Sequence, residues 1–563
     1  AGIPMTATRT GQASIADEVL HLLDAAGVTY VFTCPGTTEV PLLAAAERRA
    51  RPRLVLTTHE SAAVAMADGY ARATGEIGVV LLHANVGLCN GLATLYAAQV
   101  AHTPLLVLNG IKPTALHDRR AMTFTPESQR LAEPFCKSSV VAGSAESLVD
   151  DLARAIGVAL QSPTGPVYVG LPQDHLNQAS LGRTIGVSRA REPESAVAGQ
   201  DIVSAARDWM TTASRPLLVA GPDVARRNLT DRVESLATAL GMPIVDPPWR
   251  DLEWAATSSE HLHYAGVYRR DDPLMQASDL VVIVGAPPFL ESEAGSGSGL
   301  PWGAQVIRIV DHPSWLDSGN DRELGVVGDV ADTLERMHQA IANEPIDNSR
   351  RESHTKELRR RWEEPTSEGE SSIEPNANGV HIQTALRMVA EHIDETATAV
   401  LDPVTASSAL LDLLPRRKSS LFATGSGSLG WGMGAAVGVA LAQPDRHVVS
   451  VVGDGVFQFG IQAICTAVQL ELPVTWIVLN NNGYHAVRNA VARGRGVSAS
   501  RSHPLADITG VDYAAIARGF GAHGAIVDTA DALSRALAES GKAHVPTVID
   551  LRLHGHTTNP PGS

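Results

Sequence analysis

The sequence from 447 to 489 reads HVVSVVGDGVFQFGIQAICTAVQLELPVTWIVLNNNGYHAVRN. Two apolar runs in it, His447–Val452 and Val474–Leu479, are rich in β-branched residues and predict buried strands. The residues between the two runs are enough for a helix that joins parallel strands. Because parallel strands end at the same edge of a sheet, we expect Asp454 and Asn481 to lie close together there. The stretch therefore predicts a doubly wound α/β fold with a ligand site at that edge.

The residue types at this edge suit a divalent cation and a phosphate group. A carboxylate, an amide oxygen and a main-chain carbonyl are hard oxygen ligands that Mg²⁺ accepts, with phosphate oxygens and water completing its shell. Gly453 and Gly455 let the backbone approach a diphosphate, and a helix beginning near Gln458 is expected to direct its positive end toward the anion. A Gly-Asp-Gly sequence by itself usually forms only a turn. The asparagine after the second strand therefore gives the pattern its specificity.

The same alternation of strands and helices extends over the rest of the chain. It indicates three α/β domains, at 12–178, 198–343 and 376–555, joined by polar segments that we interpret as linkers at about 178–200 and 344–378. The second domain has no GxGxxG fingerprint, so the sequence does not indicate a dinucleotide site. Further strands are expected at 30–34, 54–58, 77–82, 104–109, 167–171, 216–220, 280–285, 305–310, 397–401, 420–423 and 548–551.

The composition of the 563-residue chain is ordinary for a globular protein, with 44% hydrophobic and 19% charged residues. A formal net charge of −16 without a basic patch argues against a nucleic-acid partner. No apolar run is long enough to span a bilayer, so no membrane association is expected. The four cysteines have no paired spacing, which favours free thiols in a reducing compartment, and we expect a cytoplasmic protein.

The Gly-Asp-Gly turn followed by Asn480-Asn481-Asn482-Gly483 resembles the signature of thiamine-diphosphate enzymes. This resemblance implies thiamine diphosphate and Mg²⁺ as cofactors. It implies that Asp454 and Asn481 bind the metal through their side chains and Gly483 through its carbonyl. The three domains would then be pyrimidine-binding, central and diphosphate-binding. The other residues implied to contact the cofactor near these motifs are Gly453, Gly455, Val456, Tyr484 and, in the first domain, Asn90.

The segment from His59-Glu60 to Gly69-Tyr70-Ala71-Arg72 resembles the part of the same family that binds the cofactor's pyrimidine ring. In the family a glutamate here drives the aminopyrimidine to the tautomer that activates the thiazolium carbon. A carboxyl group in an apolar pocket can keep the proton that this step requires. We therefore interpret Glu60 as catalytic. Taken alone, a glutamate at a helix start is as readily explained as a capping residue.

A glycine-rich passage, GSGSLGWGMG at 425–434, leads from a strand into a helix and allows the backbone to approach a ligand. In the family a bulky residue here wedges beneath the cofactor and bends its two rings into a V, and Leu429 matches that residue. The carbonyl of Gly427 would accept a hydrogen bond from the pyrimidine amine. Close packing of the helix is the alternative explanation for the glycines.

The resemblance extends over nearly the whole chain and is closest to the benzoylformate decarboxylase branch, through segments such as Pro35-Gly36-Thr37 and Leu82-His83-Ala84. In that branch a hydroxyl at the position of Thr37 and an imidazole at that of His83 face the substrate. A histidine that titrates near neutrality can move protons during turnover. His485, which directly follows the metal motif, is a further catalytic candidate. For an isolated histidine after a strand, a structural role is the more common explanation.

One departure from the branch is the loop at 289–294, which reads FLESEA and lacks the branch's second histidine. An enamine left after CO₂ loss would then lack its usual proton donor and could attack a second carbonyl. We therefore expect decarboxylation of a 2-oxo acid or, as the alternative, carboligation or aldehyde-lyase chemistry that forms a 2-hydroxy ketone, resembling acetolactate synthases. A catalytically inactive scaffold is a third hypothesis. Retention of Glu60, Asp454 and Asn481 argues against it.

The subunit arrangement is also implied by the resemblance. In the family the catalytic glutamate and the metal motif lie in different domains and meet only across a subunit interface. The smallest active unit is therefore expected to be a homodimer, commonly doubled to a homotetramer, with a small 2-oxo acid, aldehyde or ketone bound where the subunits meet.

Overall fold

The computed structural model of the chain describes residues 13–182, 198–291, 299–317, 319–342, 344–346, 348–363, 379–495, 503–542 and 545–554. These residues form three parallel sheets with helices alongside, which confirms the expected class of three doubly wound α/β domains. Among the helices of the described residues, none combines the length and the apolar character needed to cross a bilayer. The chain divides into two compact units: unit 1 comprises residues 1–192, 433–443 and 460–470, and unit 2 comprises the remainder.

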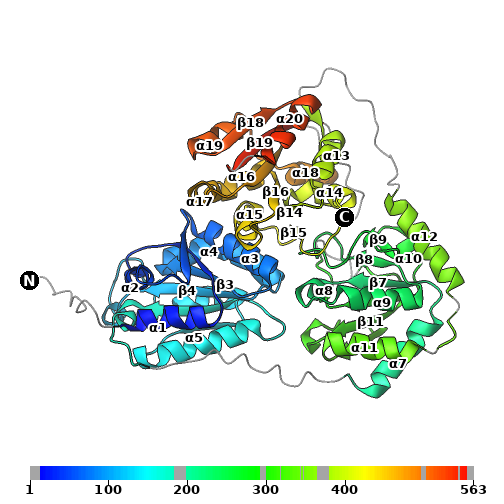
Figure 1. The fold of residues 1–563 in the computed structure, drawn as a ribbon, viewed down its shortest axis with the longest axis horizontal. Coiled ribbons are helices and arrows are strands. Elements are labelled where there is room, and N and C mark those ends of the chain that lie inside the picture. Colours follow the sequence, from blue (N-terminus) through cyan, green and yellow to red (C-terminus); the bar gives the residue numbers. More distant parts are fainter. Residues whose placement is uncertain are drawn as a thin grey trace, which may run out of the picture. The chain divides into compact units, whose positions relative to one another are not determined.

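Unit 1 contains a six-stranded parallel sheet between two layers of helices (Figure 1). Its strands are β1 (Tyr30–Cys34), β2 (Arg53–Leu56), β3 (Gly78–His83), β4 (Leu105–Ile111), β5 (Ser138–Val141) and β6 (Val167–Pro172). Its helices are α1 (Ile15–Ala25), α2 (Val40–Ala46), α3 (Glu60–Thr74), α4 (Ala84–Val100), α5 (Ala145–Leu160) and α6 (Gln173–Leu176). The strand order is β2-β1-β3-β4-β6-β5. Helices α1 and α5 pack on one face of the sheet, and α3 and α4 pack on the other.

The register of this sheet brings three strand ends to one edge. Cys34 at the end of β1 pairs with Leu82 of β3, and His83 pairs with Gly110 of β4. The turn after β1 therefore lies next to His83. This edge carries side chains of the candidate half-site in unit 1.

Two short segments of later sequence also belong to unit 1. From Met433 onward, helix α15 (Trp431–Ala442) packs tightly against α3. A Cβ atom at Gly434 would collide with Ala65, and one at Gly438 would collide with the carbonyl of Met66. Close helix packing, the alternative explanation for the glycine-rich passage, therefore accounts for Gly434, and the same packing explains Gly438 beyond the passage. Helix α17 (Ala463–Gln469) is attached through the hydroxyl of Thr466, which donates to the Leu56 carbonyl at 3.0 Å.

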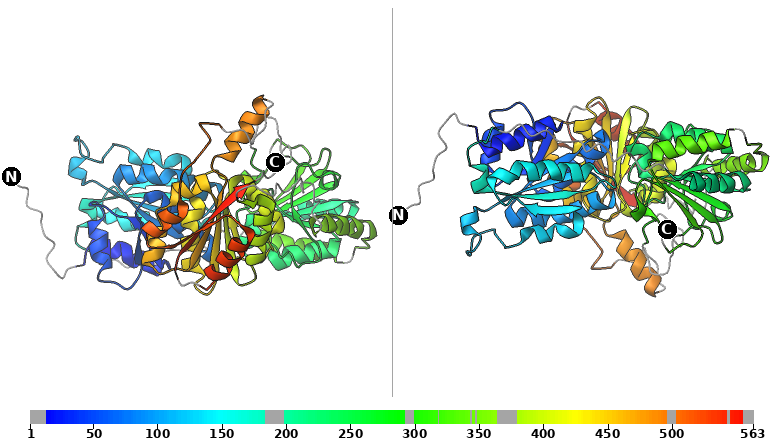
Figure 2. Two further views of the ribbon diagram at one scale, coloured as in Figure 1. Left: turned by 90° about the horizontal axis from the view of Figure 1, so that it is seen from above. Right: turned by 90° about the horizontal axis from the view of Figure 1, so that it is seen from below.

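Unit 2 contains the two other sheets, of which the central one has helices on both faces (Figures 1 and 2). Its strands are β7 (Pro216–Ala220), β8 (Ile244–Asp246), β9 (Tyr264–Val267), β10 (Leu280–Val284), β11 (Gln305–Val310) and β12 (Glu323–Val327), in the order β12-β11-β10-β7-β8-β9. Its helices are α7 (Gln200–Thr212), α8 (Pro222–Arg226), α9 (Thr230–Leu240), α10 (Pro273–Gln276), α11 (Val330–Ile341) and α12 (Ser349–Glu363).

Helix α12 corrects the interpretation of residues 344–378 as a linker throughout. Its sequence is highly charged, but it packs on the central domain through a few buried side chains. The guanidinium group of Arg351 is buried and donates to the carbonyls of Met210, Ala213 and Leu240. Satisfying those carbonyls offsets the burial of the charge, so the helix is held by tertiary contacts rather than by an apolar stripe. The segment 364–378 lies outside the described residues.

The third sheet has seven strands and carries the stretch from 447 to 489. Its strands are β13 (Val380–His381), β14 (Ala397–Asp402), β15 (Leu421–Ala423), β16 (His447–Gly453), β17 (Val474–Asn480), β18 (His523–Val527) and β19 (Thr547–His554). The order is β13-β19-β17-β16-β14-β15, with β18 also paired to β19. The other helices here are α13 (Ile382–His392), α14 (Ser407–Leu413), α16 (Asp454–Gly460), α18 (His485–Arg495), α19 (Tyr513–Gly519) and α20 (Ala530–Ser540).

A buried ion pair joins the two sheets of unit 2. The guanidinium of Arg416 donates to Asp246 at 2.7 Å, and both side chains are fully buried. Arg416 also donates to the carbonyls of Leu411 and Leu414, so its charge is well compensated. The carbonyl of Arg250, from the central domain, lies where a side chain at Gly425 would have to be. This contact places the central domain against the glycine-rich passage.

Candidate active site

The carboxyl ends of β16 and β17 bring Asp454 and Asn481 to the same edge, as the sequence predicts. The two strands are parallel neighbours, with Gly453 paired to Leu479. Asp454 is buried and accepts hydrogen bonds from the backbone N–H groups of Gly455, at 2.7 Å, and Gly483, at 2.8 Å. The helix after the turn begins at Asp454, so the expected start near Gln458 is wrong. The chain enters α16 directly from the strand, because Asp454 already adopts the helical conformation.

Burial dominates the electrostatics of Asp454. It raises the pKa of this carboxyl to about 6, although hydrogen bonds from Gly483 and Gly455 act in the opposite direction. Beside it, the Oδ1 atom of Asn481 is buried and has no hydrogen-bond partner among the described residues. A buried carboxylate next to an unpaired amide oxygen is an unfavourable arrangement in an apolar setting. A divalent cation would stabilise both groups, so the donor set fits Mg²⁺.

The loop after β17 selects which asparagine faces the site. Asn480 points toward β19, where its amide donates to Asp550 at 2.7 Å. Arg488 donates to the carbonyls of Asn481 and Asn482 and pairs with Asp507 at 2.7 Å, which fixes the loop from the other side. Of these neighbouring asparagines, Asn481 alone is among the described residues that line the cavity at this edge.

A cavity of about 200 Å³ opens at these strand ends, and all of its lining residues belong to unit 2. It brings together most of the predicted cofactor and metal residues of the third domain. The ring of Tyr484 lies against Gly455 so closely that a side chain at 455 would collide with it. The predicted residues in its wall are Leu429, Gly453, Asp454, Gly455, Val456, Asn481, Gly483, Tyr484 and His485.

The glycine-rich passage forms the wall of this cavity at Leu429. Gly427 has a left-handed backbone (φ 75°), and no atom lies within 4 Å of the position a Cβ would take, so the chain is open to a ligand there. Gly430 (φ 92°) lies against the backbone of Phe459. The passage is thus fixed at Gly430 and open at Gly427, which is consistent with the predicted roles of Gly427 and Leu429.

Asp402 lies next to the cavity and supports its wall, a role that the sequence analysis did not identify. It ends β14 and accepts a hydrogen bond from the backbone N–H of Gly432 at 3.1 Å, which holds the start of α15. Burial raises the pKa of Asp402 to about 7, against the lowering effect of hydrogen bonds from Gly432 and Gly430. The adjacent residues Pro403, Val404 and Thr405 line the cavity. An acidic residue at a strand end followed by proline is too common a pattern to identify this role.

The second candidate half-site lies in unit 1 and is built around Glu60. Glu60 is the first residue of α3 and is buried, with 8% of its surface exposed. The amide of Asn90 on α4 donates to its Oε2 atom at 3.0 Å, and the Cys34 thiol also shares a hydrogen bond with it. Gly87 leaves space beside Oε1. The N-cap of α3 is His59 rather than Glu60, so capping does not explain the buried carboxyl group.

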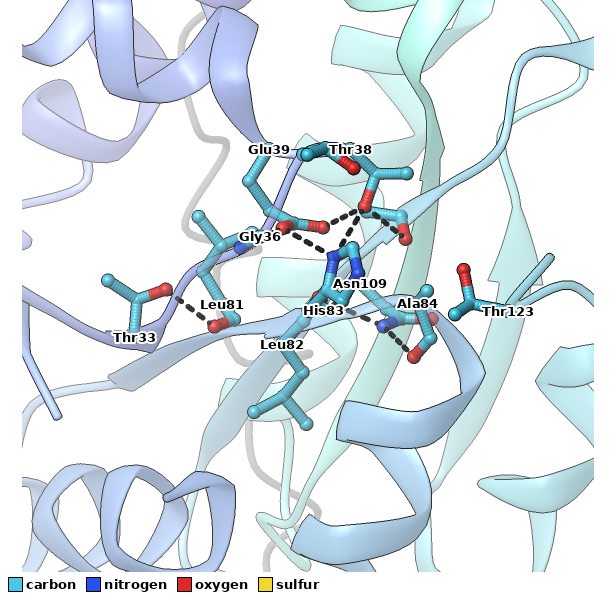
Figure 3. A network of polar contacts seen from close by, with 12 residues as sticks. Thr33, Gly36, Thr38, Glu39, Leu81, Leu82, His83, Ala84, Asn109 and Thr123 are labelled. Atoms are coloured by element: carbon cyan, nitrogen blue, oxygen red, sulfur yellow. Dashed lines mark hydrogen bonds and ion pairs between the residues drawn. The ribbon is translucent and has the colours of Figure 1, made fainter. Parts of the chain in front are cut away.

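His83 ends β3 in the same unit, in a network of buried polar groups (Figure 3). Its Nδ1 atom lies 2.9 Å from Glu39 Oε2 and 3.0 Å from the hydroxyl of Thr38. The backbone N–H of Gly36 also donates to Glu39, at 2.7 Å. The side chain of Glu39 is fully buried and that of His83 is 20% exposed. The ring is therefore held by buried groups on one side and reaches the surface of the unit on the other.

Thr37, the predicted substrate-facing hydroxyl, lies outside this network. Thr37 is exposed, and its carbonyl accepts a hydrogen bond from Gln173 at 2.9 Å. The sequence analysis missed its neighbours Thr38 and Glu39, which contact His83 directly. The sequence did contain a sign of this contact, since two polar residues lie in the turn directly after β1. Because β1 and β3 are adjacent in a sheet of this kind, these residues are expected to lie near the end of β3.

The loop that lacks a second histidine is described only as far as Glu291. Phe289 is buried against Tyr268, with their ring centroids 5.6 Å apart. The backbone of Leu290 is held on both sides: its N–H donates to Asp251 at 2.9 Å and its carbonyl accepts from Arg270 at 2.8 Å. Residues 292–294 of the predicted loop lie outside the described residues.

Comparison with known protein families gives three matches along the chain. Residues 13–130 match the N-terminal TPP binding domain of thiamine pyrophosphate enzymes, residues 203–337 match the central domain, and residues 405–551 match the C-terminal TPP binding domain. Each match falls on one of the three sheets. Both half-sites lie within the two TPP-binding matches, which supports thiamine diphosphate as the cofactor.

Individual relatives span almost the whole chain. Benzoylformate decarboxylase of Pseudomonas aeruginosa is 28% identical over 541 residues, which cover 93% of this chain and 96% of that enzyme. Acetolactate synthase isozyme 3 large subunit of Escherichia coli is 28% identical over 476 residues, covering 83% and 82%. Among solved structures, a thiamine diphosphate-dependent 4-hydroxybenzoylformate decarboxylase of Rhodococcus jostii RHA1 aligns with a TM-score of 0.82 and 28% identity, covering 97% of this chain and all of that one.

Proposed function

Because the chain belongs to the thiamine pyrophosphate enzymes, we propose that it cleaves a 2-oxo acid next to its carbonyl group, releasing CO₂. Membership makes the protein a thiamine-diphosphate-dependent lyase or transferase, which disfavours the inactive scaffold. When bound, the cofactor supplies an electron sink for the bond that breaks. The protein's residues bind and orient the reactants and move protons around that sink.

We propose that Mg²⁺ anchors the diphosphate of the cofactor through Asp454, Asn481 and the carbonyl of Gly483. The unpaired Oδ1 of Asn481 beside the buried carboxyl of Asp454 supports this proposal, because no described protein group satisfies that oxygen. Both side chains line the same cavity as Leu429, on which the cofactor rings would rest. We also assign Glu60, held by Asn90, to the pyrimidine end of the cofactor.

Decarboxylation is favoured by one observation above the others. His83 presents an imidazole from a rigid strand end, with one nitrogen held by buried groups and the ring partly exposed. Such a group can donate and accept a proton at a substrate oxygen. Relatives with decarboxylase names, at 28% identity over nearly the full length, support the same reaction class.

Carboligation is the second candidate, in which the product carbon attacks an acceptor aldehyde or ketone. It is supported by the similarity to an acetolactate synthase and by the sequence of the loop at 289–294, which has no histidine. Without a second proton donor, the product carbon is protonated more slowly and has more time to attack an acceptor. Both candidates use the same cofactor site, and they diverge only after CO₂ has been released, when the product carbon takes up either a proton or the acceptor.

A panel of 2-oxo acids, each tested with and without an aldehyde acceptor, separates the two candidates. The protein is loaded with thiamine diphosphate and Mg²⁺, CO₂ is measured continuously and products are identified by mass spectrometry. We expect CO₂ release from at least one 2-oxo acid without an acceptor, with an aldehyde as the product. Product that forms only when an acceptor is present would favour the carboligase. An absence of CO₂ release across the panel, with the cofactor bound, would contradict the proposed reaction.

We further propose that the active form is a homodimer or a pair of homodimers. Helix α4 supports this proposal, because it contains no charged residue and leaves an apolar stripe exposed at Val86, Cys89, Ala93 and Tyr96. A contiguous apolar stripe on the surface of a helix typically marks an interaction surface. Asn90, which holds Glu60, lies in the same stripe, so a covering subunit would close the space next to the carboxyl group. The scattered free thiols support a reducing, cytoplasmic location.

Charges placed on this stripe are expected to separate the subunits. The double variant Ala93→Glu with Tyr96→Glu should lower the apparent mass in light scattering to that of one chain. Turnover should be lost with it, because two desolvated carboxylates oppose association by several kcal/mol. Leu160→Glu is the matched control, since Leu160 is an exposed apolar residue at the end of α5, outside the stripe. A double variant that keeps both wild-type mass and wild-type turnover would remove α4 from the interface.

A further inference from the structure

We infer that Glu39 is a positioning residue that fixes the tautomer and the orientation of His83, so that the basic nitrogen of the resting ring is Nε2. This inference deepens the proposed function, on which it rests for the role of His83. It concerns the network drawn in Figure 3, whose members all belong to unit 1. Glu39 lies outside every motif that the sequence predicts to be functional.

The first step is the direction of the hydrogen bond to the ring. The Glu39 Oε2 atom lies 2.9 Å from His83 Nδ1 and also accepts from the backbone N–H of Gly36. The hydroxyl of Thr38 donates to the other oxygen, Oε1. A carboxylate surrounded by donors can only accept, so the Nδ1 atom must carry the hydrogen. In the neutral ring this leaves Nε2 as the atom that can take up a proton.

The second step is the fit of the carboxylate and the imidazole, which depends on two glycines. A Cβ atom at Gly110 would collide with Glu39 Oε1, and one at Gly36 would collide with the His83 ring. Two glycines therefore make the space in which the acid and the imidazole meet. Because the Glu39 side chain is fully buried, water does not compete for its oxygens.

The third step is the backbone on either side of His83, which is held separately. The amide of Asn109 donates to the carbonyls of Leu82, at 3.0 Å, and Ala84, at 2.8 Å. The hydroxyl of Tyr168 donates to Asn109 Oδ1 at 2.9 Å and fixes the amide's orientation. With its backbone clamped by Asn109 and its Nδ1 edge held by Glu39, the ring has one orientation. A partner fixed this way also stabilises the imidazolium once Nε2 is protonated.

The isosteric variant Glu39→Gln provides the test. In this variant the amide oxygen is expected to keep the Oε2 position, where the Gly36 N–H donates, and the NH₂ to take the Oε1 position, because the Thr38 hydroxyl can donate to the Gly110 carbonyl instead. The tautomer of the ring is then kept, while the negative charge beside Nδ1 is lost. Solid-state ¹⁵N spectra of histidine-labelled protein distinguish protonated from unprotonated ring nitrogens, and His83→Ala identifies the signals of His83. In the wild type, with and without cofactor, we expect Nδ1 protonated and Nε2 unprotonated. In Glu39→Gln we expect the same tautomer, with kcat lower by about 10²-fold because the imidazolium loses its counter-charge.

A double-variant cycle separates positioning from a general effect on structure. If Glu39 acts through His83, Glu39→Gln combined with His83→Ala should be no slower than His83→Ala alone. Glu47→Gln, an exposed glutamate at the other end of α2, is the matched control and should keep wild-type turnover and spectra. A wild-type His83 ring that is protonated at Nε2 would overturn the inference before any variant is made. Losses of kcat that add up in the double variant would also overturn it. If no 2-oxo acid is turned over, the proposed function fails, while the spectra still decide the tautomer.

Discussion

Glu60→Gln is expected to reduce turnover by about 10²–10⁴-fold while leaving the fold and cofactor affinity close to wild type. The side chain lies at the first residue of α3 and is buried, so glutamine fits the same space. Its amide oxygen can still accept the hydrogen bond from Asn90. Glutamine cannot hold or release a proton at this position, and we propose that this transfer at the pyrimidine ring activates the cofactor. Binding and catalysis should therefore separate in this variant.

The deuterium exchange rate of the cofactor's thiazolium proton measures this activation without a substrate. Exchange on the bound cofactor should slow in Glu60→Gln together with turnover, while the dissociation constant of thiamine diphosphate changes little. Glu76→Gln is the control, because Glu76 is exposed just beyond the other end of α3. Wild-type exchange in Glu60→Gln would show that another group activates the cofactor and would remove Glu60 from the catalytic residues.

Asn481→Leu is expected to have opposite effects on the apoprotein and on the loaded protein. The Oδ1 atom of Asn481 is buried without a partner among the described residues, and leucine of similar size removes that unsatisfied acceptor. The variant without metal or cofactor should therefore be more stable than the wild type, by about 1 kcal/mol. Mg²⁺ and thiamine diphosphate should raise the free energy of unfolding of the wild type by about 2.7 kcal/mol when the cofactor concentration is 100 times its dissociation constant. The free energy of unfolding of the variant should rise little.

Thermal melts with and without Mg²⁺ and thiamine diphosphate measure both effects in one experiment. The wild-type melting temperature should rise on loading, whereas that of Asn481→Leu should start higher and stay constant. Asn489→Leu on α18 is the matched control, since Asn489 is not among the described residues that line the cavity. Equal stabilisation of wild type and Asn481→Leu by the cofactor would contradict the assignment of Asn481 as a metal ligand.

The strands that the sequence predicts well are those buried on both faces in the middle of each sheet. The expected ranges 216–220 and 305–310 coincide with β7 and β11, whose continuous apolar runs are typical of parallel sheets. The strands β5, β8, β9, β12, β13 and β18 were missed. They have only two to five residues each, and their pairing depends on neighbours rather than on their own pattern.

The proximity of Asp454 and Asn481 could be predicted because both residues directly follow strands in one local motif. The half-site around His83 could be predicted only in part. Glu39 reaches the ring because β1 and β3 are adjacent in a register that pairs Cys34 with Leu82. That register, and the space left by Gly36 and Gly110, are properties of the assembled sheet. The sequence singled out His83 as a candidate, while its contacts with Glu39 and Thr38 required the structure.

Ala84, the first residue of α4, holds a left-handed backbone conformation (φ 46°) directly after His83, where glycine would be less strained. The methyl group of Ala84 restricts the backbone at this position to a narrow range of conformations, and glycine would widen that range. Substitutions at residue 84 are therefore expected to impair turnover more than they impair folding. Directed evolution toward new substrates should leave this position unchanged and accumulate its substitutions among cavity residues such as Val404 and Val487.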